Sequence, residues 1–198
     1  MKVIGLTGVF GSGKSTVAAF LGEKGAAVID TDKIVHQLYE PGAEGSRKVC
    51  AIFGGVVQGE AGGIDRRKLS ALVFRDKSSL DKLNAAVHPL AARRVKTLLD
   101  EHRRKHTPVV IVEAPLLIEA GWADLVDEIW VTTAPREVIF RRLSRKYGIS
   151  CRDALARIRA QLPVRELVKR ADRVINTDTS LEHLKSKVQR LWLKTAPG

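Results

Sequence analysis

The sequence predicts an α/β fold with a parallel five-stranded sheet covered by helices. Five short runs rich in apolar and β-branched residues recur along the 198 residues, and helix-like stretches separate them. All but the last run are nearly continuously apolar, which is typical of strands buried on both faces. Strands that alternate with helices favour a parallel sheet. The five runs are 2–7, 26–30, 108–115, 127–134 and 172–177.

The first strand and the helix after it enclose the most specific motif of the chain. Residues 8 to 15, GVFGSGKS, fit G-x-x-x-x-G-K-[ST] without a mismatch, in the required strand-to-helix context. In such a P-loop the backbone wraps a phosphate, the lysine reaches the outer phosphates, and the hydroxyl ligates Mg²⁺. We therefore predict that the protein binds ATP and Mg²⁺, with Ser15 on the metal and Lys14 on the phosphates. The predicted ATP-binding residues are Gly8, Gly11, Ser12, Gly13, Lys14, Ser15 and Thr16.

The rest of the chain favours a kinase among the P-loop proteins. No N-K-x-D element for reading guanine occurs, which disfavours a GTPase. The chain has room for one sheet and two small insertions, which suits a small-molecule kinase better than a motor. We therefore predict a P-loop NTPase kinase core.

The second strand ends in two acids, Asp30 and Asp32, directly before a helix-like segment. Ligands of open α/β sheets lie beyond the carboxyl ends of the strands, so these acids face the nucleotide if the first two strands are near neighbours. Asp32 is therefore a candidate for contacting the acceptor hydroxyl of a kinase. It is equally a candidate helix N-cap, and the two roles can coexist. Asp30 is assigned a supporting role, either water-mediated contact with Mg²⁺ or orientation of Lys14.

Two insertions interrupt the alternation of strands and helices. The segment 31–107 is too long for one crossover helix and contains helix-like pieces at 66–75 and 77–105. We predict that it forms a mostly helical insertion. A second segment, 135–162, follows the fourth strand and is dense in arginine.

The last helix is predicted to begin at Thr179, because Glu182 three residues later completes a capping box. We expect one apolar face along this helix. Its members are Leu181, Leu184, Val188 and Leu191.

The charge of the chain is unusual. Lysine and arginine number 34 against 22 acidic residues, a net charge of +12. Such an excess attracts either nucleic acid or polyphosphate substrates. Only 5% of the residues are aromatic and no reading helix is evident, so a nucleic-acid-binding ATPase is a remote alternative.

Other features favour a cytoplasmic protein without a membrane segment. No apolar run approaches the roughly 20 residues that a membrane span needs. The first residues have no signal-peptide layout. Cys50 and Cys151 are far apart and have no metal-site spacing, so we interpret both as ordinary thiols.

Successive motifs resemble those of the dephospho-coenzyme A kinase family, in order, from residue 3 to about 191. The P-loop is shared by many proteins, whereas the aspartate pair with EPG, the HP element and PLL are far more specific. The stretches that carry the resemblance are GLTGVFGSGKSTVAAFLGEKGAAVIDTDKIVHQLYEPG, GGIDRRKLSALVF, LNAAVHPL, APLLIE, RKYGIS, ARIRAQ and ADRVINTDTSLEHL.

The resemblance implies transfer of the γ-phosphate of ATP to the ribose 3′-hydroxyl of dephospho-coenzyme A, the last step of coenzyme A synthesis. It implies a nucleotide-binding core, a helical substrate domain and a mobile helical lid. A kinase for another nucleoside or nucleotide remains the alternative, and we expect a monomer or weak homo-oligomer that binds no nucleic acid. The predicted domains are 1–31 with 108–134 and 166–198 for the core, 32–107 for the substrate domain and 135–165 for the lid.

The resemblance also implies roles for single residues. The catalytic aspartate of the family falls on Asp32, and its lid arginine falls on Arg142, so Asp32, Lys14 and Arg142 are the predicted catalytic residues. Arg145 and Lys146 are the alternatives to Arg142. The candidate substrate-binding residues are Asp30, Arg66 and His88, where a structural role is as well founded for His88.

The chain departs from the family pattern at four places, one of which is Lys146, where the family usually has arginine. Val9 and Phe10 stand where the family usually has Gly-Ile, so a bulky ring lies on the P-loop. NTDTS at 176–180 replaces N-x-G-S near the adenine, so the base contacts of the family are not carried over to these residues. Leu167 stands where the family usually has lysine.

Overall fold

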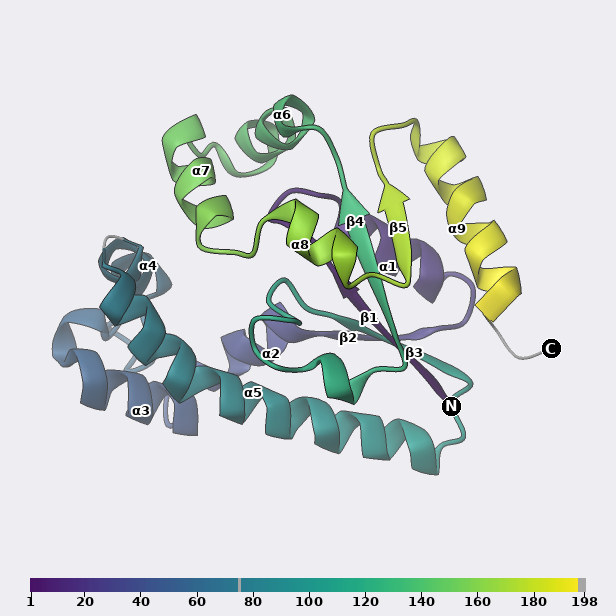
Figure 1. Ribbon diagram of the computed structural model, residues 1–198. Coiled ribbons are helices and arrows are strands. Elements are labelled where there is room, and N and C mark those ends of the chain that lie inside the picture. The colour runs from purple at the N-terminus through teal and green to yellow at the C-terminus, as the bar shows by residue number, and fades with distance from the viewer. Residues whose placement is uncertain (75, 196–198) are drawn as a thin grey trace. The chain divides into compact units, whose positions relative to one another are not determined.

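The computed structural model describes residues 1–74 and 76–195. Five strands form one sheet in the order β2-β3-β1-β4-β5 (Figure 1). The pairings of β1 with β3, β1 with β4 and β4 with β5 are parallel, which confirms the predicted α/β class with a parallel sheet. The strands are β1 (Lys2–Thr7), β2 (Ala27–Asp30), β3 (Val109–Glu113), β4 (Glu128–Thr133) and β5 (Arg173–Asn176).

Helices account for most of the remaining described residues. The predicted helical pieces at 66–75 and 77–105 correspond to α4 and α5, although Arg75 lies outside the described residues. The helices are α1 (Lys14–Gly22), α2 (Thr31–Leu38), α3 (Glu44–Phe53), α4 (Arg66–Val73), α5 (Lys77–Arg104), α6 (Arg136–Tyr147), α7 (Cys151–Arg159), α8 (Val164–Lys169) and α9 (Leu181–Thr195), with short 3-10 turns η1 (Gly55–Val57) and η2 (Ala123–Leu125). None of the helices in the described part of the chain combines the length and apolar character that a membrane span requires.

The chain forms two compact units. The first comprises Met1–Ile29 and the chain from Leu98 onward, and the second comprises Asp30–Thr97. The helix α5 contributes residues to both units, because its chain runs from Lys77 to Arg104. The assignment of these parts as nucleotide core, substrate domain and lid stays a prediction.

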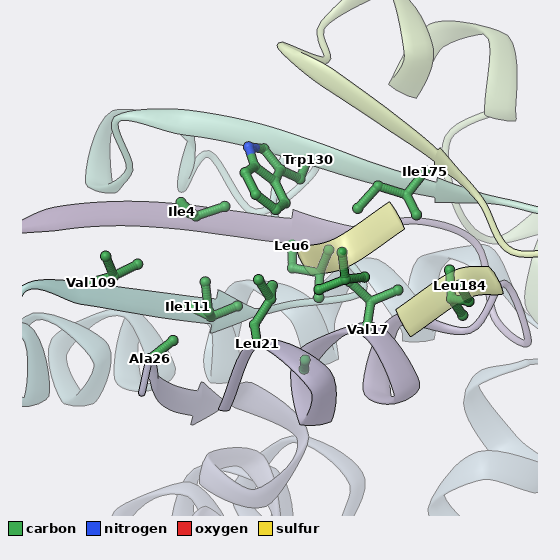
Figure 2. Close-up of a cluster of buried hydrophobic side chains, with 12 residues drawn as sticks. Ile4, Leu6, Val17, Leu21, Ala26, Val109, Ile111, Trp130, Ile175 and Leu184 are labelled. Atoms are coloured by element: carbon green, nitrogen blue, oxygen red, sulfur yellow. The ribbon is translucent and has the colours of Figure 1, made fainter. Parts of the chain in front are cut away.

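One face of the sheet in the first unit packs against α1 and α9. Figure 2 shows side chains of four strands directed at Val17 and Leu21 of α1, with Leu184 of α9 beside them. Trp130 is fully buried in this cluster, where its indole N–H donates to Glu128 at 2.8 Å. The strand members are Ile4, Leu6, Val109, Ile111, Trp130 and Ile175.

The opposite face packs against α6, α7 and α8. Val131, next to Trp130 in β4, belongs to this second cluster, because successive strand residues point to opposite faces. Both faces are therefore buried, which explains the nearly continuous apolar runs of the sequence. Leu167, the departure from the family's lysine, is fully buried here and serves the core. The helix members are Ile139, Leu143, Ala154 and Leu167.

Two predicted helix starts are wrong. Asp30, not Asp32, caps α2, because β2 stays extended through Asp30 and its carboxylate accepts the Lys33 N–H at 3.1 Å. Ser180, not Thr179, precedes α9, and its hydroxyl accepts the His183 N–H at 3.2 Å. Several residues of each segment are chemically able to cap a helix, so the dihedral angles of the chain decide which one does.

The predicted apolar face of α9 is correct for three of its four members. Leu184 and Val188 are buried, and Leu191 packs against the same cluster. Leu181 is 66% exposed, because it is the first residue of the helix and lies beyond the edge of the core.

The second unit has a core of its own. Val49 of α3, Leu69 of α4 and Val87 of α5 meet there with residues of the intervening turns. This confirms that a mostly helical segment follows the second strand. The buried members are Val49, Val57, Ile64, Leu69, Val73, Leu83 and Val87.

Candidate active site

The P-loop joins β1 to α1 in the first unit. Gly8 and Gly13 have φ of 145° and 93°, in the region that side chains other than glycine rarely adopt. A Cβ on Gly8 would lie 2.5 Å from the carbonyl oxygen of Thr132, so β4 leaves no room for one. The glycines predicted from the motif are therefore needed both for the backbone turn and for close approach to the sheet.

Lys14 is buried and its ammonium lies over the P-loop. Its Nζ donates to the carbonyl oxygens of Gly8 at 2.8 Å and Val9 at 3.3 Å. In a P-loop this lysine reaches the outer phosphates of the nucleotide. The structure therefore places Lys14, the residue predicted to bind phosphate, against the loop that carries the motif.

Glu113 is a candidate site residue that the sequence analysis missed. Its strand β3 lies between β1 and β2, so β1 and β2 are not neighbours, and Glu113 stands in register with Leu6 of β1. The Ser15 hydroxyl donates to Glu113 Oε1 at 2.6 Å, and the Glu113 side chain is buried. The available signal was an acid that ends an apolar run, as Asp30 does in β2. Strand order decides which of these acids lies beside the P-loop.

Ser12 and Thr177 tie the P-loop to the ends of β4 and β5. The Ser12 hydroxyl lies 2.7 Å from the hydroxyl of Thr132, and both side chains are buried. The Thr177 hydroxyl donates to the Ser12 carbonyl at 2.8 Å. The Ser12 side chain is therefore occupied by the protein, which leaves phosphate contacts to the backbone of the loop.

Arg142 lies on α6 and forms two hydrogen bonds with Thr177. Its Nη1 donates to the Thr177 hydroxyl at 2.9 Å and its Nη2 to the Thr177 carbonyl at 2.7 Å. Within the described residues no carboxylate pairs with this guanidinium. Neutral oxygens of Thr177 thus hold the guanidinium next to the P-loop, and no carboxylate among the described residues neutralises its charge. The alternatives, Arg145 and Lys146, are exposed on the same helix.

Asp30, the last residue of β2, and Asp32 belong to the second unit. Asp30 is half-buried and caps α2, whereas Asp32 is exposed in the first turn of that helix. A carboxylate in the first turn is favoured by the helix dipole. The catalytic role of Asp32 and the supporting role of Asp30 stay predictions.

The other predicted substrate-binding residues also lie in the second unit. Asp65 caps α4 by accepting the N–H groups of Arg67 and Lys68, which places Arg66 exposed in the first turn. Burial raises the pKa of the Tyr39 phenol to about 12, although the nearby charge of Arg66 acts in the opposite direction. The roles of Arg66 and His88 toward substrate stay predictions.

His88 of α5 gives a prediction about stability. Burial lowers the pKa of His88, so the folded state favours the neutral ring. Its contribution is complete above about pH 6.5, the ordinary histidine pKa, and is lost as the pH falls below that value because the unfolded chain takes up the proton first. We expect the urea-unfolding free energy to fall less between about pH 7.5 and 5.5 in His88→Gln than in the original protein. An equal fall would contradict this, and His183→Gln, on the exposed side of α9, is the control.

The geometry thus presents a P-loop, a lysine, a hydroxyl–carboxylate pair and an arginine of α6. Comparison with known proteins names the family. The family model described as "Dephospho-CoA kinase" matches residues 2–183. The chain belongs to the dephospho-CoA kinase family. A dephospho-CoA kinase of Dehalococcoides mccartyi is 43% identical over 192 residues, 96% of each chain.

Solved structures share the fold of this chain. The crystal structure of TT1252 from Thermus thermophilus has a TM-score of 0.81 and 37% identity, covering 99% of this chain and 98% of that one. Dephospho-CoA kinase from Campylobacter jejuni shares the fold with a TM-score of 0.66 and 22% identity, covering 100% of this chain and 98% of that one. As a member of the dephospho-CoA kinase family, the chain is a kinase that uses ATP and phosphorylates a hydroxyl group.

Proposed function

We propose that this protein transfers the γ-phosphoryl group of ATP to the ribose 3′-hydroxyl of dephospho-coenzyme A, giving coenzyme A and ADP. The family match over residues 2–183 carries the proposal. The P-loop supports the phosphate-donor side of the proposal independently, because Lys14 and Ser15 belong to that loop and Arg142 is joined to it through Thr177.

The phosphate donor is held from two sides. The backbone N–H groups of the P-loop and the N-terminus of α1 supply positive partial charges, and Lys14 adds a full charge. Arg142 supplies a second cation, on the lid. Charge that develops on the transferring group is therefore met by preorganised donors, which is the main source of catalysis in phosphoryl transfer.

The residues present fit a Mg²⁺ ion. Mg²⁺ prefers oxygen ligands and is bound by one or two protein groups together with substrate phosphates. The Ser15 hydroxyl and the Glu113 carboxylate offer such oxygens 2.6 Å apart. No cluster of three acidic, histidine or cysteine side chains occurs in residues 1–74 and 76–195, so the remaining ligands would be phosphate oxygens and water. When bound, the ion neutralises phosphate charge.

Glu113→Gln tests this arrangement. The amide keeps a hydrogen-bond acceptor for Ser15 but removes the negative charge. We therefore expect kcat to fall about 10–100-fold and the Mg²⁺ concentration at half-maximal rate to rise. The measurement is a Mg²⁺ titration of the steady-state rate at saturating ATP. If the Mg²⁺ concentration at half-maximal rate is unchanged, Glu113 only packs against Ser15.

On the acceptor side, Asp32 is the proposed partner of the 3′-hydroxyl, whose proton it accepts as the phosphoryl group transfers. Asp30, Arg66 and His88 are proposed to contact the substrate. We also propose that the protein acts in the cytoplasm as a monomer or weak homo-oligomer and that its net charge of +12 attracts polyphosphate substrates rather than nucleic acid.

An acceptor screen with ATP tests the function. We expect ADP formation with dephospho-coenzyme A and a product that carries a new 3′-phosphate, with little turnover on nucleosides or nucleotides. Turnover of a nucleoside with inert dephospho-coenzyme A would replace the assignment by another small-molecule kinase. Hydrolysis stimulated by DNA or RNA and sensitive to salt would indicate a nucleic-acid-dependent ATPase instead.

A further inference from the structure

Gln161 follows α7 at the end of the predicted lid and joins two loops of the first unit. Its Oε1 accepts the backbone N–H of Phe10 at 2.7 Å, across 151 residues of sequence. Its Nε2 donates to the carbonyl oxygen of Pro115 at 3.0 Å. One side chain thus connects the P-loop to the loop that follows β3.

These contacts require the chemistry of an amide. A backbone N–H can only donate and a backbone carbonyl can only accept, so the side chain between them must present one acceptor and one donor. Glutamine does so, and the two partners determine which end of its amide faces which loop. An ionised carboxylate of the same shape has no proton to give to Pro115.

The contact matters because it acts on the phosphate-binding loop itself. Phe10 lies between Gly8 and Gly11, two of the glycines that give the loop its turn. Gln161 holds the Phe10 N–H, so one point of the loop is positioned by the protein rather than by the phosphates. A loop set before nucleotide arrives loses less conformational freedom on binding.

The ring of Phe10 adds two contacts with the lid. Its centroid lies 5.5 Å from that of Tyr147, in a stacked arrangement. The guanidinium of Arg157 lies 5.4 Å from the Phe10 centroid, within the range of a cation–π contact. The backbone and the side chain of Phe10 are therefore both held by residues of the predicted lid.

The end of the predicted lid is anchored a second time. The Leu162 N–H donates to Glu119 Oε1 at 2.8 Å, so residues 161 and 162 are both tied to the segment after β3. Glu119 engages only the backbone of the lid, whereas Gln161 reaches the P-loop. Of these two anchors, Gln161 is therefore the one that joins the lid to the backbone of the P-loop.

We propose that Gln161 is a positioning residue that sets the P-loop for nucleotide from the end of the lid, through the Phe10 amide and the Pro115 carbonyl. The proposal deepens the proposed kinase function and rests on it for the kinetic readout, but nucleotide binding tests it without any acceptor.

The test compares Gln161→Glu, Gln161→Met and the control Gln189→Glu. Gln189, on α9, has no side-chain hydrogen bond within the described residues, so its variant makes the same chemical change away from the P-loop. At about pH 8, where the introduced carboxyl is ionised, we expect Gln161→Glu to weaken ATP binding and kcat/KM for ATP about 10–100-fold. Gln161→Met should lose a similar factor, and the control less than about twofold.

The pH profile separates positioning from packing. A protonated carboxyl has one donor and one acceptor, so it reproduces both hydrogen bonds of the amide. We expect the deficit of Gln161→Glu relative to the original protein to shrink between about pH 8 and 5.5, while that of Gln161→Met stays constant. Arg157 lies over the Phe10 ring, Glu119 accepts the Leu162 N–H, and Lys14 donates to the Val9 carbonyl next to Phe10. Because every variant retains these charged groups, the ratio at each pH isolates the changed residue.

Two outcomes would overturn the proposal. One is ATP affinity in both Gln161 variants equal to that of the original protein. The other is an equal, pH-independent loss in Gln161→Glu and Gln161→Met, which indicates lost packing alone. If Gln161→Glu does not fold, Gln161→Met, which keeps the length of the side chain, decides by its ATP affinity. If the ATP-binding deficit of Gln161→Glu shrinks at low pH as expected but dephospho-coenzyme A is not phosphorylated, the role of Gln161 stands and the proposed acceptor is rejected.

Discussion

Asp32→Asn is expected to lower kcat by about 10²- to 10⁴-fold, while the affinity for ATP stays within about threefold of the original value. Asparagine has the same shape as aspartate but cannot take the proton of the acceptor hydroxyl. The cap of α2 is untouched by this substitution, because Asp30 and not Asp32 accepts the Lys33 N–H. A rate loss therefore does not arise from loss of this cap. The measurements are single-turnover phosphoryl transfer and equilibrium ATP binding.

Asp30→Asn is the matched control. Asparagine is as good an N-cap as aspartate, so α2 should stay intact. We expect a loss of less than about tenfold, as for a residue that supports but does not perform the transfer. Near-normal turnover in Asp32→Asn would reject its catalytic role. A larger loss in Asp30→Asn than in Asp32→Asn would exchange the roles of the two acids.

Arg142→Lys is expected to lower kcat by about 10²- to 10³-fold. Lysine keeps the charge but lacks the planar fork, so it has no pair of separate nitrogens to match the hydroxyl and the carbonyl of Thr177 as Nη1 and Nη2 of Arg142 do. The cation then loses its fixed place beside the P-loop. The rate of phosphoryl transfer at saturating substrates measures the effect, with ATP affinity measured in parallel.

Arg145→Lys is the control, because it makes the same substitution on the exposed side of the same helix, α6. It should change kcat by less than about threefold. Thr177→Val supplies a second line of evidence, because it removes the hydroxyl that links Arg142 to Ser12. Its effect and that of Arg142→Lys should not add, since the two residues act through one contact. Additive losses, or a larger loss in Arg145→Lys, would reject the assigned role of Arg142.

The parts of the site that the sequence predicted correctly depend on residues that are close together in the chain. The P-loop was predictable because its glycines, Lys14 and Ser15 act within eight consecutive residues. The strands were predictable because both faces of the sheet are buried. The caps were not, since Asp30 and Asp32 are equally able to cap, and the choice depended on how far β2 stays extended.

Residues that contact the P-loop from distant parts of the chain could not be predicted from such local patterns. Glu113, Thr177 and Gln161 reach it across 98, 165 and 151 residues, and no spacing rule connects them to the motif. Glu113 needed the strand order, which places β3 rather than β2 beside β1. The Phe10 ring, a departure from the family pattern, gained a role only once Tyr147 and Arg157 were seen to pack on it.

By itself the sequence determined the α/β class, the phosphate-binding loop and the resemblance to a kinase family, because each depends on the order and spacing of nearby residues. Tertiary structure decided which carboxylate joins Ser15, which oxygens hold Arg142 and which side chain holds the Phe10 amide. The physical reason is that a hydrogen bond requires two groups within about 3 Å, and only the folded chain brings residues so far apart in sequence to that distance.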